Sequence, residues 1–224
     1  QNGKMPIHLS HACINDIVDI FYEEYKLAAK ERNIELKIIK PEENIMAWCD
    51  AEKIGVIINN LINNAFKYTS SGGNITVTIN SENSKCRITV ADNGASIPEQ
   101  QLDTIFERFS MADNVMSADS QQNGTGIGLS LARAFATMHH GRIWAENIEN
   151  NGGVVFILEI PTEKEVYNKD NTEMLIDDNT VSITPQAINS PNDNITKESQ
   201  EQPYNTDRPT LVLVEDNADL RSML

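Results

Sequence analysis

Residues 51–68 combine the pattern of an amphipathic helix with an unusual number of asparagines. Apolar residues recur at the spacing of one helical face, at Ile54, Ile57, Ile58, Leu61, Ile62, Ala65 and Phe66. Four asparagines fall between positions 59 and 64, although each is less favourable in a helix than alanine by up to ~0.7 kcal/mol. Asn60, Asn64 and Lys67 share a side next to the apolar one. The amides therefore serve something other than helix stability.

Helix-like and strand-like segments alternate on both sides of this stretch. Helices are expected where apolar residues recur at helical spacing, at about 10–32, at 51–68, through Ile105 and Phe106, and from 124 to about 139. Strands are expected where β-branched and other apolar residues form short or alternating runs, at 34–39, 45–49, 74–80, 86–92, 142–147 and 152–161. The polar, non-periodic stretch 110–123 is typical of a mobile loop.

Length, charge and cysteine content limit the class of protein. The 224 residues suit one domain with attachments. A net charge of -15 argues against a general surface for nucleic acid or anionic lipid, so an anionic ligand needs a local basic pocket. We find neither an apolar run near the ~18 residues of a membrane span nor a secretion signal, and we expect a cytoplasmic setting. Cys13, Cys49 and Cys86 lie among apolar residues, which favours free thiols.

The composition changes after Pro161. Residues 162–208 are polar, acidic and poor in aromatic residues, so we expect a disordered linker in which "EMLI" (173–176) makes at most a transient contact. Residues 209–224 become apolar again and contain a strand-like run followed by Glu215 and Asp216. They are expected to begin a second domain.

Three local features point to a nucleotide. The glycines in "GTGIG" (124–128) open a helix, where free backbone amides and the helix dipole favour phosphate oxygens. Asp92 ends a strand before a glycine turn, where its carboxylate suits an amine such as that of adenine, although an ordinary turn aspartate fits the same pattern. Asn60 and Asn64 offer amide oxygens one helical turn apart, which suits a hard cation bound to a polyphosphate.

Taken in order, four motifs resemble the boxes of a known family. "NNLINNAFKYT", "DNG", "IFERF" and "GTGIGLSLA" resemble the N, G1, F and G2 boxes of the ATP-binding catalytic domain of sensor histidine kinases, over roughly residues 6–161. The resemblance implies a Bergerat-type two-layer α/β sandwich, in which helices back a mixed β-sheet. DNA gyrase, a heat-shock chaperone and mismatch-repair ATPases share this fold.

The same resemblance assigns roles to individual residues. It makes Asn64 the magnesium ligand, Lys67 a phosphate contact, Tyr68 part of the adenine site and Asp92 the acceptor of the adenine amine. Residues 110–123 would form the ATP lid. The other nucleotide-binding positions that it implies are Gly94, Ile97, Phe109, Gly124, Thr125, Gly126, Ile127, Gly128 and Leu129.

The sequence departs from the family pattern at three places. Ser96 replaces a second glycine that often follows "DNG". Ser110 and Met111 replace a Tyr-Arg pair whose arginine reaches the terminal phosphate, so Arg108 or a partner must supply that charge. Asn60 stands where ATP-hydrolysing relatives carry a water-activating glutamate, and an amide is no general base. The expected catalytic residues, for presenting a phosphoryl group rather than for hydrolysis, are Asn60, Asn64, Lys67 and Arg108.

The resemblance also implies neighbouring domains. In the family, a phosphoacceptor histidine followed by an acidic residue and a Thr-Pro pair lies on a dimerising helical hairpin, and residues 1–5 resemble only the end of that hairpin. Residues 209–224 resemble the first strand of a response-regulator receiver, with Glu215 and Asp216 as its acidic metal-binding pair. His8 and His11 are expected at the start of the first helix, and His139 and His140 at a helix end, in contact with its last carbonyls.

The expected function is that of a hybrid histidine kinase domain that binds ATP with Mg²⁺ and presents the terminal phosphate to a histidine on a separate domain. The expected partners are that dimerisation domain and the receiver, without nucleic acid or direct membrane contact. An isolated domain is expected to be monomeric, and its parent a homodimer at the cytoplasmic side of a bacterial inner membrane. The alternatives are an ATPase of the gyrase or chaperone class, an anti-sigma-type serine kinase, and a nucleotide-binding module with little turnover.

Overall fold

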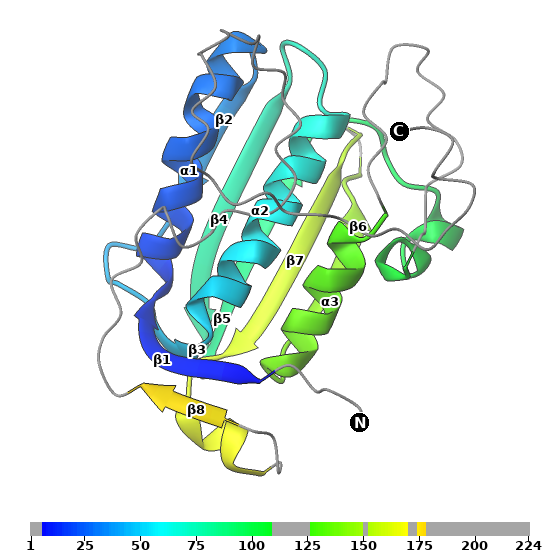
Figure 1. Ribbon diagram of the computed structural model, residues 1–224. Helices are drawn as coiled ribbons and strands as arrows, with labels where there is room; N and C mark the ends of the chain where they lie inside the picture. The colour runs from blue at the N-terminus through cyan, green and yellow to red at the C-terminus, as the bar shows by residue number, and fades with distance from the viewer. Residues whose placement is uncertain (1–5, 109–125, 150–151, 170–173, 178–224) are drawn as a thin grey trace, which may run out of the picture. The chain divides into compact units, whose positions relative to one another are not determined.

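Helices α1 (Ile14–Glu31), α2 (Ala51–Tyr68) and α3 (Gly128–Met138) lie against one face of a five-stranded sheet (Figure 1). The strands follow one another in space as β2 (Glu35–Ile39), β4 (Asn74–Glu82), β5 (Lys85–Asp92), β7 (Val154–Pro161) and β6 (Arg142–Asn147). This computed structural model describes residues 6–108, 126–149, 152–169 and 174–177, all within the unit Gln1–Ser190. The predicted α/β sandwich is confirmed.

The sheet is mixed, and its hairpins fix the register. β2 pairs in parallel with β4, whereas the pairs β4–β5, β5–β7 and β6–β7 are antiparallel. The β4–β5 hairpin turns through Asn83 and Ser84, whose φ angles of 52° and 58° suit a two-residue hairpin between right-twisted strands. Asp92 therefore ends β5 opposite Ile75. Two short 3₁₀ turns, η1 (Glu99–Gln101) and η2 (Thr104–Phe106), follow where a short helix was expected.

Helix α2 is the central element of the core. Asp50 caps it by accepting a hydrogen bond from the Lys53 amide at 3.1 Å, as its position before the helix predicts. The predicted apolar face is buried between α1, α3 and the sheet. Tyr25 of α1 donates from its hydroxyl to Asn59 Oδ1 at 2.7 Å and stacks on Phe66. One of the four asparagines therefore joins two helices.

The first helix begins later than expected, because a strand precedes it. Residues Ile7–Cys13 form β1, which pairs antiparallel with β3 (Met46–Cys49), with Ser10 opposite Cys49. The expectation that the helix starts at Ser10 is therefore wrong, as is the placement of His8 and His11 at its beginning. Backbone pairing with a segment more than thirty residues away decides this structure, and the helical spacing of apolar residues carries no sign of it.

The segment after Pro161 also differs from the expectation of a disordered linker. Lys164–Lys169 form a 3₁₀ helix, η3, and Met174–Asp177 form β8, which pairs in parallel with β1. Tyr167 of η3 is 1% exposed, contacts Ile7 and Leu9, and donates a hydrogen bond from its hydroxyl to the carbonyl of Trp48 at 3.0 Å. We call Lys164–Lys169 and Met174–Asp177 together the C-terminal clasp. The rest of the expected linker and residues 209–224 lie outside the described residues.

The end of α3 is tied to the start of α2 through His139. Its ring is fully buried, its Nε2 accepts a hydrogen bond from the Asp50 amide at 2.9 Å, and its Nδ1 lies 2.7 Å from the Phe135 carbonyl. Nδ1 therefore carries the proton and donates to Phe135, which confirms the expected contact with a last carbonyl of the helix. Burial lowers the pKa of His139, so the ring is a neutral structural link.

The cysteines agree with the expectation of free thiols. Cys49 and Cys86 are free and buried, and Cys13 is free and half-buried. Among the described helices, none has the length and hydrophobicity that a membrane crossing needs.

Candidate functional site

Three of the predicted motifs meet where α2, the end of β5 and the start of α3 come together. A Cβ atom at Gly94, just after β5, would collide with the carbonyl oxygen of Tyr68 at the end of α2. A Cβ atom at Gly128, the first residue of α3, would collide with the side-chain oxygen of Asn60. These glycines are therefore needed for close approach between elements. The fold brings together the N, G1 and G2 boxes, which are far apart in the sequence.

Asp92 is the most deeply buried of those predicted binding residues that the structure describes. It is 3% exposed, and its Oδ1 accepts a hydrogen bond from the Gly94 amide at 2.8 Å. The Val154 amide also donates to this carboxylate. Burial raises the pKa of Asp92 to about 6, and the two amide hydrogen bonds oppose that rise. A buried acceptor beside a glycine turn suits a neutral donor such as an exocyclic amine.

The asparagines of α2 divide their roles between structure and ligand. The Asn60 Nδ2 donates to the Val56 carbonyl at 2.8 Å, which leaves Oδ1 directed at Gly128. Asn64, one turn further, is half-buried and makes no side-chain hydrogen bond to another described residue. Lys67 is exposed at the C-terminal end of α2, with Nζ 5.3 Å from the centre of the Tyr68 ring. Among the predicted site residues of this helix, Asn64 and Lys67 have polar groups that remain available to a ligand.

The structure describes the second half of the glycine-rich motif, at the start of α3. Gly126 has a φ of 64°, a conformation that glycine adopts without strain. Ile127 is 45% exposed, and Leu129 is half-buried against the core. Phe109, Gly124, Thr125 and the expected lid at 110–123 lie outside the described residues.

Arg108, a predicted catalytic residue, follows η2 and is exposed. It lines a groove of about 570 Å³ beside α3, together with Phe106, Ile127, Arg133 and other residues of that helix. It therefore shares a surface with Ile127, next to the glycine-rich start of α3. Its reach toward the phosphates stays a prediction.

Sequence reasoning missed a residue that holds the loop after Asp92. Asn147, the last residue of β6, accepts a hydrogen bond from the Ile97 amide at 2.9 Å through Oδ1. Its Nδ2 donates to the Ile97 carbonyl at 2.7 Å. Fifty residues separate the two partners, so no local pattern could have indicated this contact.

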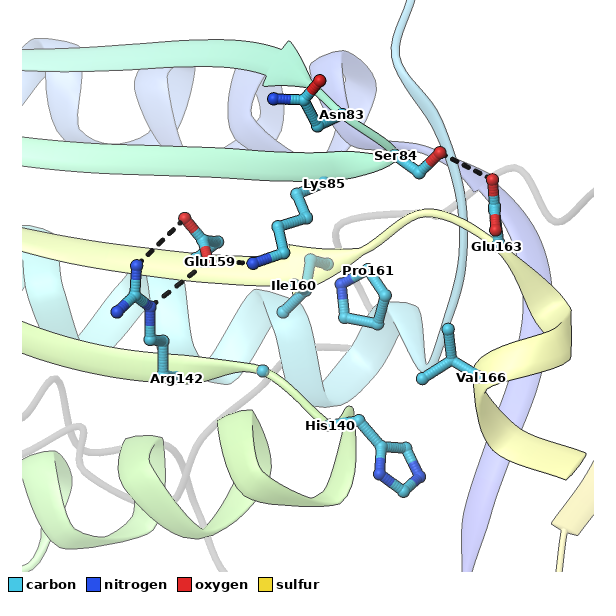
Figure 2. A pocket seen from close by; sticks show the side chains of 11 residues that line it. Asn83, Ser84, Lys85, His140, Arg142, Glu159, Ile160, Pro161, Glu163 and Val166 are labelled. Atoms are coloured by element: carbon cyan, nitrogen blue, oxygen red, sulfur yellow. Dashed lines mark hydrogen bonds and ion pairs between the residues drawn. The ribbon is translucent and has the colours of Figure 1, made fainter. Parts of the chain in front are cut away.

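A second cavity lies at the opposite end of β5 from Asp92. It measures about 610 Å³ and includes Lys85, Arg142 and Glu159 in its lining. Figure 2 shows the Lys85 and Arg142 side chains converging on Glu159, with distances of 2.9 and 3.2 Å. Arg87 also pairs with this carboxylate, and the basic partners lower the pKa of Glu159 to about 2. The central carboxylate is already paired with the basic groups, so this cavity is poorly suited to a phosphate.

Comparison with known proteins agrees with this arrangement. Residues 49–164 match the family described as histidine kinase-, DNA gyrase B-, and HSP90-like ATPase. The hybrid signal transduction histidine kinase D of Dictyostelium discoideum is 35% identical over 75% of this chain and 11% of its own length. The sensor histidine kinase TmoS of Ectopseudomonas mendocina is 30% identical over 99% of this chain and 22% of its own length. This chain thus spans under a quarter of either relative.

Solved structures give the same result. The nucleotide-free catalytic domain of histidine kinase ThkA has a TM-score of 0.61 and 31% identity, and the match covers 69% of this chain and 95% of that one. ThkA has also been solved in complex with the response regulator protein TrrA, with a TM-score of 0.59 and 29% identity over 70% of this chain and 42% of that one. The family match covers more than half of the chain, from the start of α2 through β7, and includes the three motifs that the fold brings together. The chain therefore belongs to the family of histidine kinase-, DNA gyrase B- and HSP90-like ATPases.

Proposed function

We propose that this chain binds ATP with Mg²⁺ between α2, the end of β5 and the start of α3, and presents the terminal phosphate to a histidine on a separate dimerisation domain. The observation that carries the proposal is the close approach of α2 to the loop after Asp92 and to the start of α3, at Gly94 and Gly128, where a Cβ would collide with Tyr68 and Asn60. Asn64 lies on α2 between these two contacts in the sequence. An acceptor for a base amine, an oxygen ligand for a cation and a helix start for phosphates thereby meet in one region.

In this proposal each predicted residue has one task. Asp92 accepts the amine of adenine, beside Tyr68 and the loop through Gly94 and Ile97. The half-buried carboxamide of Asn64 fits a hard cation, because its oxygen has no other partner among the described residues and the polyphosphate supplies most of the charge. A Mg²⁺ ion held by Asn64 would supply positive charge that offsets the charge of the phosphates.

The basic groups and the glycine-rich segment complete the proposed site. Lys67 contributes a positive charge toward the phosphates. The backbone amides at the start of α3, from Gly126 to Leu129, would contribute to binding the same group. Arg108 would supply the charge that the family's missing Tyr-Arg pair otherwise provides.

Transfer to a histidine is favoured over hydrolysis because of Asn60. Its amide donates to the Val56 carbonyl and its oxygen lies against Gly128, and neither atom of a carboxamide takes up a proton at neutral pH. An ATPase of the gyrase or chaperone class needs a base near this position. The site is accordingly one that holds a phosphoryl group ready for a separate acceptor, in keeping with the histidine kinases that this chain resembles.

The acceptor belongs to another domain in this proposal. His8 lies in β1, where its backbone amide donates to Asp50 Oδ2 at 2.9 Å, and His11 stacks on Trp48. Both residues are thus built into the domain rather than carried on a helical hairpin. A receiver beginning near residue 209 is proposed as the downstream partner, and the ThkA complex with a response regulator supports that kind of partner. The parent protein is proposed to be a homodimer at the bacterial inner membrane.

Titration with a fluorescent ATP analogue, with and without magnesium, tests the proposal. We expect saturable binding that ATP displaces and that magnesium strengthens, because the cation reduces the charge of the triphosphate in a chain of net charge -15. An ADP competition series measures how much the terminal phosphate contributes. Failure of ATP to displace the analogue would overturn the proposal.

A further inference from the structure

The loop that follows Asp92 depends on one side chain of another strand for its position. The carboxamide of Asn147, at the end of β6, holds both backbone groups of Ile97, at 2.9 Å for the amide and 2.7 Å for the carbonyl. Between Asp92 and Ile97, the residues Ala95 and Ser96 are exposed and belong to no helix or strand. None of the four family motifs includes Asn147, so neither the sequence pattern nor the resemblance gives it a role.

The turn between β6 and β7 also contacts the other end of this loop. The Ile148 amide donates to the Gly153 carbonyl at 3.0 Å, which closes the turn. Gly153 has a φ of 97°, and a Cβ atom there would collide with the carbonyl oxygen of Asp92. Val154, the next residue, donates its amide to the Asp92 carboxylate. The adjacent ends of β6 and β7 therefore hold the loop at its first residue, Asp92, through Val154 and at its last residue, Ile97, through Asn147.

On its opposite side the loop meets α2, where Gly94 packs against the carbonyl of Tyr68. The backbone path from Asp92 to Ile97 is thus held by α2, by the start of β7, by Asn147 and by β4, where Asn93 exchanges hydrogen bonds with the backbone of Asn74. Removal of the Asn147 carboxamide would leave the other contacts and free the end of the loop at Ile97. The separation between the Asp92 carboxylate and the Ile97 side chain would then vary.

We propose that Asn147 is a positioning residue that sets the preference for adenine over other bases. The inference rests on the proposed function, in which Asp92 accepts the adenine amine and Ile97 contacts the base. Guanine presents an oxygen where adenine presents that amine, so a rigidly held Asp92 carboxylate rejects it. With the Ile97 end of the loop free to shift, adenine would lose part of its contact, and guanine could move away from the Asp92 carboxylate, which the other contacts still hold.

The exposure of the Ile97 backbone distinguishes a positioning role of Asn147 from a role in global stability. The Ile97 backbone lies in a half-exposed loop, so water can satisfy its amide and carbonyl once Asn147 is truncated. Truncation of the Asn147 side chain should therefore loosen the loop while lowering the free energy of unfolding only slightly. An aspartate at 147 would still accept from the Ile97 amide, but it would repel the Ile97 carbonyl, so it keeps half of the interaction.

The test uses the full chain and compares Asn147→Ala and Asn147→Asp with the wild type. Asn15→Ala is the matched control, because Asn15 Oδ1 accepts from the backbone amide of Ile45 at 3.0 Å in the same manner. Asn15 is the second residue of α1, whereas the loop contacts the end of α2 through Gly94 and Tyr68. Dissociation constants are measured for ATP, GTP and inorganic tripolyphosphate, each with magnesium, alongside urea unfolding.

For Asn147→Ala we expect ATP binding to weaken about tenfold, the ratio of ATP to GTP affinity to narrow by a similar factor, and tripolyphosphate binding to stay within about twofold. Asn147→Asp should lie between this variant and the wild type. Asn15→Ala should unfold at lower urea concentration with an unchanged ATP to GTP ratio.

Two results would overturn the inference. An unchanged ATP to GTP ratio in both Asn147 variants would show that the contact does not position the base site. Equal weakening of ATP, GTP and tripolyphosphate would assign Asn147 a purely structural role. Failure of the wild type to bind ATP would instead remove the proposed function itself, and the wild-type titration reveals that before any variant is compared.

Discussion

The side-chain oxygen of Asn60 lies so close to the Cα of Gly128 that a Cβ atom at that residue would collide with it. The N box on α2 and the G2 box at the start of α3 are therefore in direct contact. Because Asn60 also donates to the Val56 carbonyl at 2.8 Å, its carboxamide has little freedom to move away. A side chain at position 128 has to displace either the amide or the start of α3.

Gly128→Ala is expected to lower the free energy of unfolding by about 1–3 kcal/mol through overpacking, as measured by urea denaturation. The double variant with Asn60→Ala should recover most of this loss, because the colliding oxygen is gone. Independent, additive losses in the two single variants would contradict the contact. ATP affinity should fall in Gly128→Ala, since the start of α3 is displaced from α2.

Asn64→Ala is expected to remove most of the magnesium dependence of ATP binding while leaving the unfolding free energy within about 0.5 kcal/mol of the wild type. The physical reason is that the Asn64 amide has no hydrogen-bond partner among the described residues and would face the cation. Asn63→Ala, an exposed neighbour on the same helix, is the control. Parallel losses of stability and binding would assign Asn64 to the core instead.

The raised pKa of Asp92 predicts that folding stability and ATP affinity change with pH in opposite directions. Its pKa rises from 3.8 to about 6 on folding, so the native state holds a proton that the unfolded state has already released between those values. The resulting stabilisation is complete below pH 3.8 and is lost as the pH rises through about 6. Adenine recognition needs the carboxylate, so ATP affinity should instead fall as the pH drops below about 6.

Urea unfolding and ATP titration between pH 4.5 and 8 should resolve both trends, and Asp92→Asn should flatten both, because an amide does not titrate in this range. The same variant should weaken ATP far more than inorganic tripolyphosphate. Persistence of the pH dependence of ATP binding in Asp92→Asn would assign it to another group.

The C-terminal clasp is expected to contribute to stability through Tyr167. Tyr167→Phe removes the hydrogen bond to the Trp48 carbonyl and should reduce the unfolding free energy by about 1 kcal/mol. Tyr167→Ala also empties the space against Ile7 and Leu9 and should reduce it by about 3 kcal/mol or more. Tyr22→Phe, at a half-buried tyrosine of α1, serves as control. Urea unfolding indistinguishable from the wild type in Tyr167→Ala would restore the description of this segment as a linker.

Residues 1–224 should bind ATP with magnesium and yet fail to label themselves with radioactive phosphate. No residue pattern of an acceptor histidine occurs in them, and His8 and His11 belong to β1. A dimerisation hairpin added in trans should accept the label, and one joined covalently should accept it faster, because tethering raises the effective concentration. Acid-labile, stoichiometric labelling of His8 or His11 would show that the acceptor lies within this domain.

Much of the sheet and the helices could be predicted from local sequence. The face of α2 follows from the recurrence of Ile54, Ile58 and Leu61, and β4 and β5 follow from alternating β-branched runs. These patterns report burial within one element, which neighbouring residues in the sequence determine. Asp50 as a helix cap was equally local.

Contacts between distant segments decided the rest. β1 and β8 form because they pair with segments distant in the sequence, and no local pattern identified either of these two strands. Tyr167 is ordered because Trp48, Ile7 and Leu9 lie where its ring can be buried. The composition of residues 162–208 as a whole is polar and acidic, and it did not indicate that Tyr167 would be buried.

The candidate site shows the same division. Its motifs were visible in the sequence, because each is a short run of residues with its own chemistry. The contact of Asn60 with Gly128, the burial that raises the pKa of Asp92, and the hold of Asn147 on Ile97 arise only when three elements are packed together. Hydrogen bonds and desolvation depend on distances in space, and the folded chain alone sets those distances.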